Sequence, residues 1–572
     1  MDREQTEGRV FRRWRYALVI AAFACLPVAL LWRAADLQLV NNDFLQHQGD
    51  ARHLRTMDIP ANRGMIMDRH GEPLAISTPV DSIWAHPGNL LTEEQRLGEL
   101  ARLLELDTDN LRQRLIQRSG REFAYLRRHV NPDLAAQVLA LGLPGVATQR
   151  EFRRYYPAGE VTGHLLGFTD IDDVGLEGLE LSYESWLRGR PGSKRVLRDR
   201  HGRVVSDVEQ IREPAPGRDL ELSIDRRLQY VAYRELKRAV GAHGARGGSL
   251  VLLDAESGEV LAMVNQPAYN PNARQRAGTT ERRNRAVTDS FEPGSTIKPF
   301  TVVAALESGL FASDTQLNTH PGTMRVGNHT VRDFRDYGRI DVATVLSKSS
   351  NVGTSKLALE LPEDAVWNVL ARVGMGRTTG AGFPGETAGA LTVEPPRSRI
   401  DRATLSFGYG LASTPLQLTS AYAALASDGV LRSPSFLRLD EAPDGERVMS
   451  AEVARGVRRM LEEAVDDGGT GQLAAVPGYR VAGKTGTTRK SIAGGYADDR
   501  YVAWFAGIAP ASRPRLVMSV MIDEPAGEFH YGGEVAAPVF AEVMSAALRL
   551  LNISPDAGPA EPGLTAMGER RQ

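Results

Sequence analysis

The hydrophobic pattern begins with one long apolar segment near the start of the chain. Residues 16–32 contain no charged side chain, and this length is close to the lower limit of the roughly 17–25 residues that cross a bilayer as a helix. Trp14 and Trp32 flank the segment, as aromatic residues do at membrane interfaces. The pattern predicts a transmembrane anchor over 16–33, after a tail over 1–15.

The basic residues around this segment predict its orientation. Arg33 follows it closely, whereas five arginines precede it, namely Arg3, Arg9, Arg12, Arg13 and Arg15. Because cytoplasmic flanks carry the excess of basic residues, we expect the tail in the cytoplasm and the chain after 33 outside it. The alternative is a cleaved signal peptide, but the best cleavage site, residues 33–35, contains an arginine where a small residue is needed.

After the anchor, the pattern predicts two modules. Residues 34–215 are irregular and arginine-rich, with one helix from a capping box at Thr92 and a second from about Pro132. Residues 213–217 contain two prolines and a glycine, which resist both helix and central strand and predict a joint between modules. Prolines and small residues over 553–572 predict a disordered tail.

The second module, 216–552, mixes two periodicities. Apolar residues alternate or cluster as in strands over four segments, and they recur at helical spacing over three others. The strand segments are 249–254, 259–264, 501–508 and 516–522, and the helical segments are 225–240, 296–307 and 453–465. Helices inserted between early and late strands of one sheet indicate an α+β fold.

Composition narrows the function classes. The 69 Lys and Arg residues nearly balance the 71 Asp and Glu residues, for a net charge of -2, so no overall field favours nucleic acid. The single cysteine, Cys25, excludes an internal disulfide framework and a zinc cluster with several thiolates. Lysine is scarce, and its positions are therefore informative: 194, 237, 298, 348, 356, 484 and 490.

One of these lysines has the spacing of a base next to its nucleophile. Ser295 lies three positions before Lys298, so on a helix the amine can reach the hydroxyl and take its proton. Pro293 and Gly294 predict that a helix starts at Ser295, where a free backbone N–H can help to bind an oxyanion. A lysine base must be uncharged, so we expect burial and a second cation to lower its pKa.

Two further triplets follow in the chain. Ser349-Ser350-Asn351 is the only Ser-x-Asn, and Lys484-Thr485-Gly486 is the only Lys-Ser/Thr-Gly. With Ser295 and Lys298 they match, in order, the Ser-x-x-Lys, Ser-x-Asn and Lys-Thr-Gly set of penicillin-binding proteins and class A β-lactamases.

A P-loop is the rival interpretation of Lys484. Residues 478–485 fit its pattern, and Asp523 follows an apolar run as in an ATPase. However, a P-loop must lead into a helix, and the residues after Thr485 have no helical periodicity. The predicted topology also places this segment away from cytoplasmic ATP. Neither a His-Glu-x-x-His nor a Gly-x-Ser-x-Gly motif occurs, and we expect neither a metal nor another cofactor.

Beyond these triplets, the chain resembles the class B penicillin-binding proteins, in particular the division-type, FtsI-like transpeptidases. The matching segments are 63–71, 153–157, 163–167, 175–180, 407–410, 414–417, 496–501 and 531–533. The resemblance implies the penicillin-binding transpeptidase fold, with a central antiparallel sheet sandwiched by helices and a helical subdomain. It also implies that 34–215 is an elongated pedestal of the dimerisation type.

The implied activity is that of a serine D,D-transpeptidase that cross-links peptidoglycan stem peptides ending in D-Ala-D-Ala during septal synthesis, and that β-lactams inhibit. The residues implied in catalysis are Ser295 as nucleophile, Lys298 as base, Ser349 and Asn351 as proton relay and support for Lys298, and Lys484 as added positive charge. Those implied in substrate binding are Thr485, Gly486 and Thr487, with the N–H groups of Ser295 and Thr487 as oxyanion hole.

The resemblance further implies a single-pass protein of the bacterial inner membrane, with its catalytic domain in the periplasm. The implied partners are a membrane-embedded, FtsW-like SEDS glycosyltransferase and bitopic division proteins. Four alternatives stay open: an elongation-type transpeptidase, a D,D-carboxypeptidase, a β-lactamase and a non-catalytic scaffold of the division machinery. Against the β-lactamase, no Glu-x-x-x-Asn-like segment of class A enzymes lies between Asn351 and Lys484.

Overall fold

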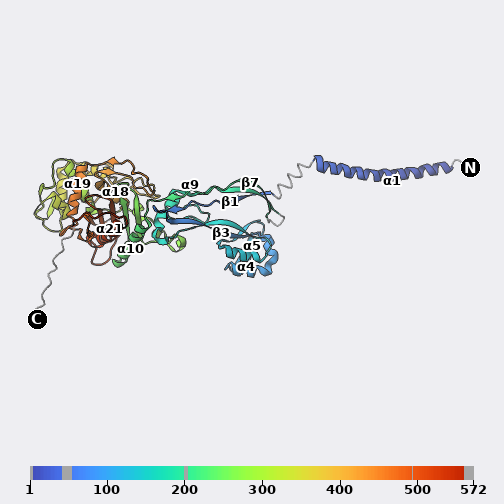
Figure 1. Ribbon diagram of the computed structural model, residues 1–572, viewed down its shortest axis with the longest axis horizontal. Helices are drawn as coiled ribbons and strands as arrows, with labels where there is room; N and C mark the ends of the chain where they lie inside the picture. Colours follow the sequence, from blue (N-terminus) through green and yellow to red (C-terminus); the bar gives the residue numbers. More distant parts are fainter. Residues whose placement is uncertain (1–3, 41–53, 199–203, 493, 559–572) are drawn as a thin grey trace, which may run out of the picture. The chain divides into compact units, whose positions relative to one another are not determined.

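A computed structural model describes residues 4–40, 54–198, 204–492 and 494–558 (Figure 1). The chain divides into two units. Unit 1 comprises residues 1–62, 79–153 and 189–216, and unit 2 comprises residues 63–78, 154–188 and 217–572.

The predicted anchor lies in α1 (Glu4–Ala35), which a π-helical turn, Asp36–Val40, follows. Residues 14–38 form a stretch of 25 residues that is long and apolar enough to cross a membrane, and none of its apolar window is buried. This helix fits a single-pass membrane protein.

Unit 1 contains a three-stranded antiparallel sheet of order β1-β6-β7, with β1 (Leu54–Ile59), β6 (Gly192–Arg198) and β7 (Val204–Arg212). It also contains β4 (Ala124–Val130) and four helices: α3 (Pro87–Leu90), α4 (Leu97–Leu103), α5 (Thr108–Gln117) and α6 (Pro132–Ala140). Their core is rich in leucine, with Leu90, Leu97, Leu100, Leu104 and Leu111 buried. The helix expected near Pro132 is confirmed, whereas α5 was not predicted.

The capping box expected at Thr92 is wrong. Residues 91–96 form a 3₁₀ turn in which Glu93 leaves helical geometry, and α4 begins at Leu97. The Thr92 hydroxyl donates to the Asn89 carbonyl (2.7 Å) instead of accepting from a backbone N–H. The non-helical backbone at Glu93 separates the apolar helix face from the expected cap.

Two segments of the expected pedestal belong to unit 2. They contain β2 (Ile66–Met67), α7 (Gly163–Leu166), α8 (Gly178–Ser182) and α9 (Glu184–Leu187). β2 pairs in parallel with β8 (Leu220–Glu221), and β3 (Pro73–Ala85) and β5 (Val146–Tyr155) each pass from one unit into the other. Glu180, completely buried, accepts from Arg63 Nε (2.8 Å) and Arg154 Nε (2.6 Å). By contacts, these two segments of the expected module 34–215 are therefore grouped with unit 2.

The core of unit 2 is a five-stranded antiparallel sheet of order β10-β9-β19-β18-β17. The strands are β10 (Val260–Gln266), β9 (Gly247–Asp254), β19 (Leu516–Asp523), β18 (Gly495–Ala509) and β17 (Ala482–Ile492). Four of them match predicted strands, whereas β17 was not predicted.

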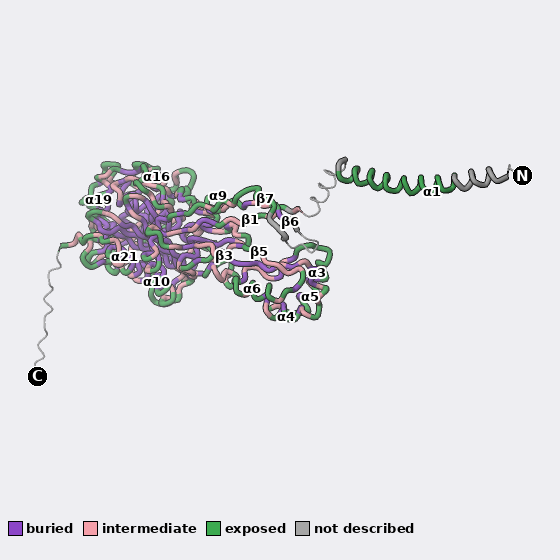
Figure 2. Tube along the Cα trace, turned by 45° about the vertical axis from the view of Figure 1, so that its right-hand side comes forward, coloured by how far each residue is buried: buried purple, intermediate pink, exposed green. Residues whose placement is uncertain are grey.

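Both faces of this sheet are apolar, and helices cover both. Leu250 and Leu252 of β9 pack with α10 (Arg226–Ala242) and α21 (Ala537–Leu550), whereas Val251 and Leu253 belong to the core on the other side, with α18 (Pro415–Ala426). Alternate residues of a strand point to opposite faces, so nearly every position of β9 is buried. Figure 2 shows that the buried residues of unit 2 gather in its interior. The α+β fold with an antiparallel sheet between helices is confirmed.

The other elements of unit 2 are short. The helices are α11 (Thr279–Arg282), α12 (Arg285–Thr288), α13 (Lys298–Glu307), α14 (Val342–Ser347), α15 (Asn351–Glu360), α16 (Ala365–Arg372), α17 (Arg399–Leu405), α19 (Ala451–Glu462) and α20 (Gly532–Val535). Three antiparallel pairs join β11 (Gln316–Asn318) to β14 (Arg339–Asp341), β12 (Thr323–Val326) to β13 (His329–Arg332), and β15 (Val430–Leu431) to β16 (Glu446–Arg447).

The chain end differs in part from its prediction. Asp556 accepts from the Arg480 N–H (2.7 Å) and from the Ser512 hydroxyl (2.6 Å), so these contacts hold residues that were expected in the disordered tail over 553–572. The rest of that tail, 559–572, lies outside the described residues.

Candidate active site

Ser295 lies in a 3₁₀ turn, Gly294–Ile297, that leads directly into α13. The predicted helix thus begins at Lys298, three residues later than expected, because the chain first makes a tighter turn from Gly294, whose φ is +55°. Two hydrogen bonds fix this turn: the Thr296 hydroxyl donates to the Pro293 carbonyl (2.8 Å), and the Tyr422 hydroxyl donates to the Thr296 carbonyl (2.8 Å). Ser295 itself is half-buried.

This turn lies directly against β17, an edge strand of the sheet. The Thr488 hydroxyl donates to the Glu292 carbonyl (3.1 Å). A Cβ on Gly486 would lie 2.7 Å from the Pro293 carbonyl oxygen, a distance that forces a shift. Gly486 therefore permits the close approach of the Ser295 turn to the strand that carries the Lys-Thr-Gly triplet.

Lys298, whose exposed fraction is 1%, is held by the Ser-x-Asn triplet. Its Nζ donates to the Ser349 carbonyl (2.5 Å), to Ser349 Oγ (3.1 Å) and to Asn351 Oδ1 (2.7 Å). An uncharged amine has two hydrogens and a lone pair, so one of these three contacts is released when the proton leaves. The structure thus brings Lys298, Ser349 and Asn351 together, although no described hydrogen bond links Ser295 Oγ to Lys298 Nζ.

Asp333, which sequence analysis missed, holds the Ser-x-Asn triplet. Its Oδ1 accepts from the N–H groups of Asn351 (2.5 Å) and Val352 (2.9 Å), and its Oδ2 accepts from the Ser350 hydroxyl (2.6 Å). These groups form the first turn of α15, where a carboxylate is favoured by the unpaired N–H groups. Ser349, just before this turn, has a φ of +61°. No local sequence signal marks Asp333, because it reaches α15 from the end of β13.

The Lys-Thr-Gly triplet lies inside β17. Lys484 is completely buried, yet its Nζ has only long contacts, with the Thr485 carbonyl (3.2 Å), Thr485 Oγ1 (3.4 Å) and Thr470 Oγ1 (3.5 Å). The Thr487 hydroxyl accepts from the Gly532 N–H (2.9 Å). Because no helix follows Lys484, the P-loop interpretation is wrong.

Burial and charge lower the pKa values of both lysines. Burial, and then the positive charge of Lys484, depress the pKa of Lys298 well below its usual 10.5, while the carboxylate of Asp333 opposes this effect. Burial lowers the pKa of Lys484 to about 7. The expectation that burial and a second cation lower the pKa of Lys298 is confirmed, so this amine loses its proton more readily than an exposed lysine does.

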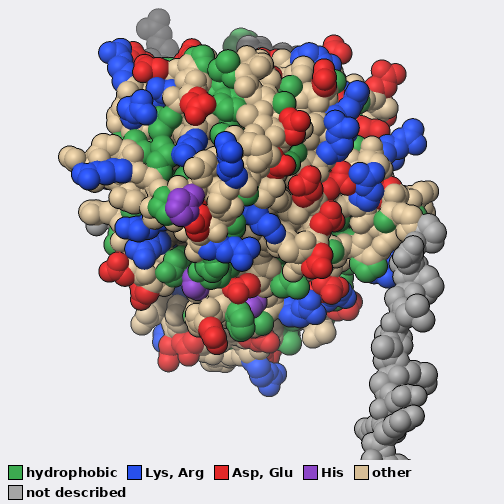
Figure 3. Space-filling view, turned by 90° about the vertical axis from the view of Figure 1, so that its left-hand side faces the viewer, with side chains coloured by type: hydrophobic (Ala, Val, Ile, Leu, Met, Phe, Trp, Pro, Cys, Tyr) green, Lys and Arg blue, Asp and Glu red, His purple; other side chains and the backbone are tan. Residues whose placement is uncertain are grey.

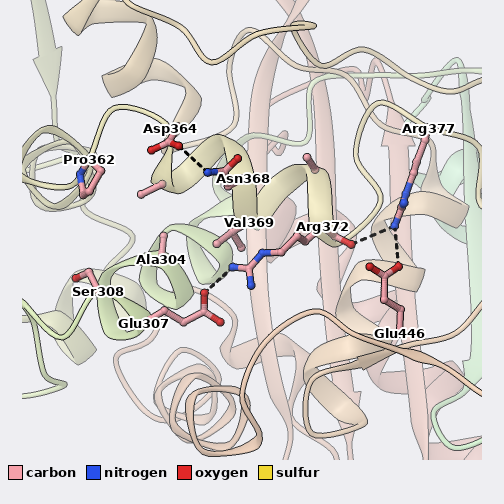
Figure 4. Close-up of a pocket in the computed structure, with 12 residues that line it drawn as sticks. Ala304, Glu307, Ser308, Pro362, Asp364, Asn368, Val369, Arg372, Arg377 and Glu446 are labelled. Carbon is pink, nitrogen blue, oxygen red and sulfur yellow. Dashed lines mark hydrogen bonds and ion pairs between the residues drawn. The ribbon is translucent and has the colours of Figure 1, made fainter.

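A separate cavity of about 660 Å³ lies at the other end of α13 (Figure 4). It contains none of the predicted site residues, and its arginines are already paired, Arg372 with Glu307 (2.5 Å) and Arg377 with Glu446 (3.7 Å). The face of unit 2 in Figure 3 also mixes basic and acidic side chains without a large patch of one sign. Neither feature competes with the Ser295 site.

Two family profiles match the chain. The Penicillin-binding Protein dimerisation domain matches residues 58–222, and the Penicillin binding protein transpeptidase domain matches residues 248–545. The chain is 44% identical to the peptidoglycan D,D-transpeptidase FtsI of Escherichia coli (strain K12) over 97% of this chain and 95% of the relative. It is also 44% identical to the probable peptidoglycan D,D-transpeptidase PenA of Neisseria meningitidis serogroup A over 96% of this chain and 95% of that protein.

Solved structures agree with these matches. Penicillin binding protein 3 of Mycobacterium tuberculosis, complexed with aztreonam, is 30% identical and has a TM-score of 0.69, over 88% of this chain and 98% of that chain. The apo transpeptidase domain of Burkholderia pseudomallei penicillin-binding protein 3 is 40% identical, with a TM-score of 0.55 over 59% of this chain and 98% of that chain. The chain therefore belongs to the class B penicillin-binding proteins, with a dimerisation and a transpeptidase domain, in the group of FtsI-type peptidoglycan D,D-transpeptidases.

Proposed function

We propose that this protein is a membrane-anchored peptidoglycan D,D-transpeptidase of septal wall synthesis, with Ser295 as its nucleophile. The observation that carries the proposal is the environment of Lys298. This lysine lies one turn from Ser295, is buried, is held by Ser349 and Asn351, and has a pKa well below its usual value. Such an amine can act as a base for the neighbouring hydroxyl.

Acylation begins when the Ser295 oxygen attacks the carbonyl carbon of the penultimate D-Ala and Lys298 takes the hydroxyl proton. The bond to the terminal D-Ala then breaks, and this leaving amine receives the proton through Lys298 and Ser349. An amine of a second stem peptide attacks the resulting ester and forms the new amide bond. Its released proton returns through Lys298 to Ser295, so the enzyme is regenerated.

The contacts of β17 support a second role, the binding of the substrate carboxylate. Lys484 has no acceptor closer than 3.2 Å among the described residues, so its donor capacity remains available to a carboxylate oxygen. Thr485 and Thr487 would add their hydroxyl groups. We assign the oxyanion hole to the N–H groups of Ser295 and Thr487, because the Ser295 turn packs against this strand.

The proposed location follows from α1 and its basic flank: a single pass through the inner membrane, with the N-terminus in the cytoplasm and unit 2 in the periplasm. Peptidoglycan stems and β-lactams are the proposed ligands, in line with the aztreonam and ampicillin complexes of the Mycobacterium protein. An FtsW-like SEDS glycosyltransferase and bitopic division proteins are the proposed partners, and these rest on the family resemblance alone.

Labelling of the full-length protein with a fluorescent penicillin tests the nucleophile. We expect wild-type protein and a Ser545→Ala control to be labelled, a Ser295→Ala variant to remain unlabelled, and mass spectrometry to find the adduct on Ser295. A labelled Ser295→Ala variant would refute the assignment. With a D-Ala-D-Ala stem peptide as substrate, cross-linked dimers identify a transpeptidase, whereas trimmed monomers alone identify a carboxypeptidase.

A further inference from the structure

The loop between α19 and β17 contacts two separate parts of the site. The Gly468 carbonyl accepts from Lys348 Nζ (2.6 Å), and Lys348 directly precedes Ser349. Two residues further along the loop, Thr470 Oγ1 accepts from the Thr485 hydroxyl (3.0 Å) and lies 3.5 Å from Lys484 Nζ. None of the three sequence motifs includes residues 466–471, which we call the bridging loop.

The bridging loop is closely packed at its base. The Gly471 N–H donates to the Ala464 carbonyl (2.8 Å), and the Gly469 N–H donates to the Asp466 carbonyl (2.9 Å). A Cβ on Gly469 would lie 2.3 Å from the Ala464 oxygen. Position 469 therefore accepts only glycine unless the backbone shifts.

The far side of the loop packs against a segment that also contacts the site. A Cβ on Gly533 would lie 2.5 Å from the Thr470 carbonyl oxygen, and the neighbouring Gly532 donates its N–H to Thr487 Oγ1. Thr470 is thus held between this segment and β17, while the residue as a whole is exposed.

We propose that the bridging loop is a positioning element of the transpeptidase site, with Lys348 and Thr470 as its two positioning residues. It connects the segment that holds the base with the strand that binds the substrate carboxylate. These two parts come from distant stretches of sequence. Acylation requires that they keep their relative positions, since a shift of about 1 Å can lower a rate by roughly two orders of magnitude. This inference rests on the proposed function of Ser295 and the strand.

A double-mutant cycle tests the bridge. The full-length protein is compared with Lys348→Met, Thr470→Val and the double variant, and the acylation rate constant is measured with a fluorescent penicillin. We expect each single variant to lose about tenfold or more in this constant. The loss in the double variant should equal the larger of the two single losses and not their product, because removing either contact breaks the same connection. Losses that multiply in the double variant, or single variants that react like wild type, would overturn the proposal.

Controls separate this role from general destabilisation. Lys356 Nζ donates to the Asn318 carbonyl (2.5 Å), a comparable lysine-to-loop bond, and we expect Lys356→Met to react like wild type. Thr470→Ser keeps the hydroxyl and should restore the rate, which a purely structural loss of the side-chain methyl group would not allow. Melting temperatures identify variants that fail to fold, and in that case Lys348→Ala and Thr470→Ala, which also remove the two contacts, replace them in the cycle. If Ser295 of the wild-type protein is not labelled, the proposed function is refuted. If Ser295 is labelled but the losses multiply, or the single variants react like wild type, only the bridge is refuted.

Discussion

Replacing Lys484 by methionine is expected to stabilise the protein while it slows acylation. The lysine is completely buried, and burial lowers its pKa from 10.5 to about 7. At about 1.4 kcal/mol per pKa unit, this shift means that charging Lys484 in the folded protein costs about 5 kcal/mol. Methionine has a similar length and no charge, so it removes this cost and loses only the long contacts of Nζ.

The sign of the pH dependence follows from the two pKa values. Between pH 7 and 10.5 the unfolded chain binds more protons at this position than the folded protein does, so the free energy of unfolding rises with pH. Below pH 7 Lys484 is protonated in both the folded and the unfolded state, so the folded protein carries the full cost of the buried charge. The stability gain of the Lys484→Met variant is therefore largest below pH 7 and decreases towards pH 10.5.

Urea unfolding of both proteins at several pH values measures this difference. We expect the variant to exceed wild type by up to about 5 kcal/mol in slightly acidic buffer, and the excess to shrink by about 1.4 kcal/mol per pH unit through the alkaline range. Its acylation should be slower at neutral pH, because loss of the Lys484 charge raises the pKa of Lys298. A pH-independent difference, or a wild type that is more stable in acidic buffer, would refute the reasoning.

Two further variants test the environment of the proposed base, Lys298, and of the proposed nucleophile, Ser295. Asp333→Asn removes the charge that raises the pKa of Lys298 but keeps an acceptor for the first turn of α15. We therefore expect the acidic limb of the pH profile of the acylation rate to move to lower pH. An acidic limb at the wild-type pH would contradict this expectation. Gly408→Ala should lower the acylation rate by roughly two orders of magnitude, because its Cβ would lie 2.0 Å from the Gly294 carbonyl oxygen. Gly410→Ala is the matched control, because Gly410 also has a positive φ (+76°) and its added Cβ meets nothing within 4 Å. Equal losses of rate in both variants would show that backbone strain, and not displacement of the Ser295 turn, is responsible.

Sequence spacing marks the residues of the proposed site, but not the residues that support them. The Ser295–Lys298 spacing and the later triplets depend on local order along the chain, and the structure places these residues around one turn and one strand edge. Asp333 and Thr470 reach the triplets from other segments, so nothing next to them in sequence marks their role. The strand β17 was missed for a related reason: its glycine and polar residues pack against the Ser295 turn, and they lack the apolar alternation that predicts a strand.

Hydrogen-bond distances distinguish two buried charged side chains, Glu180 and Lys484. Both oxygens of the buried Glu180 accept close hydrogen bonds, one from Arg63 and one from Arg154, and loss of one partner in such a cluster leaves a buried charge uncompensated. Lys484 is equally buried, yet its nearest described acceptor is 3.2 Å away. A buried charge with close partners stabilises its own arrangement, whereas one with distant partners has favourable energy to gain from an incoming carboxylate. The segments with Arg63, Arg154 and Glu180 therefore belong to the architecture of unit 2, whereas the contacts of Lys484 support its proposed role in substrate binding.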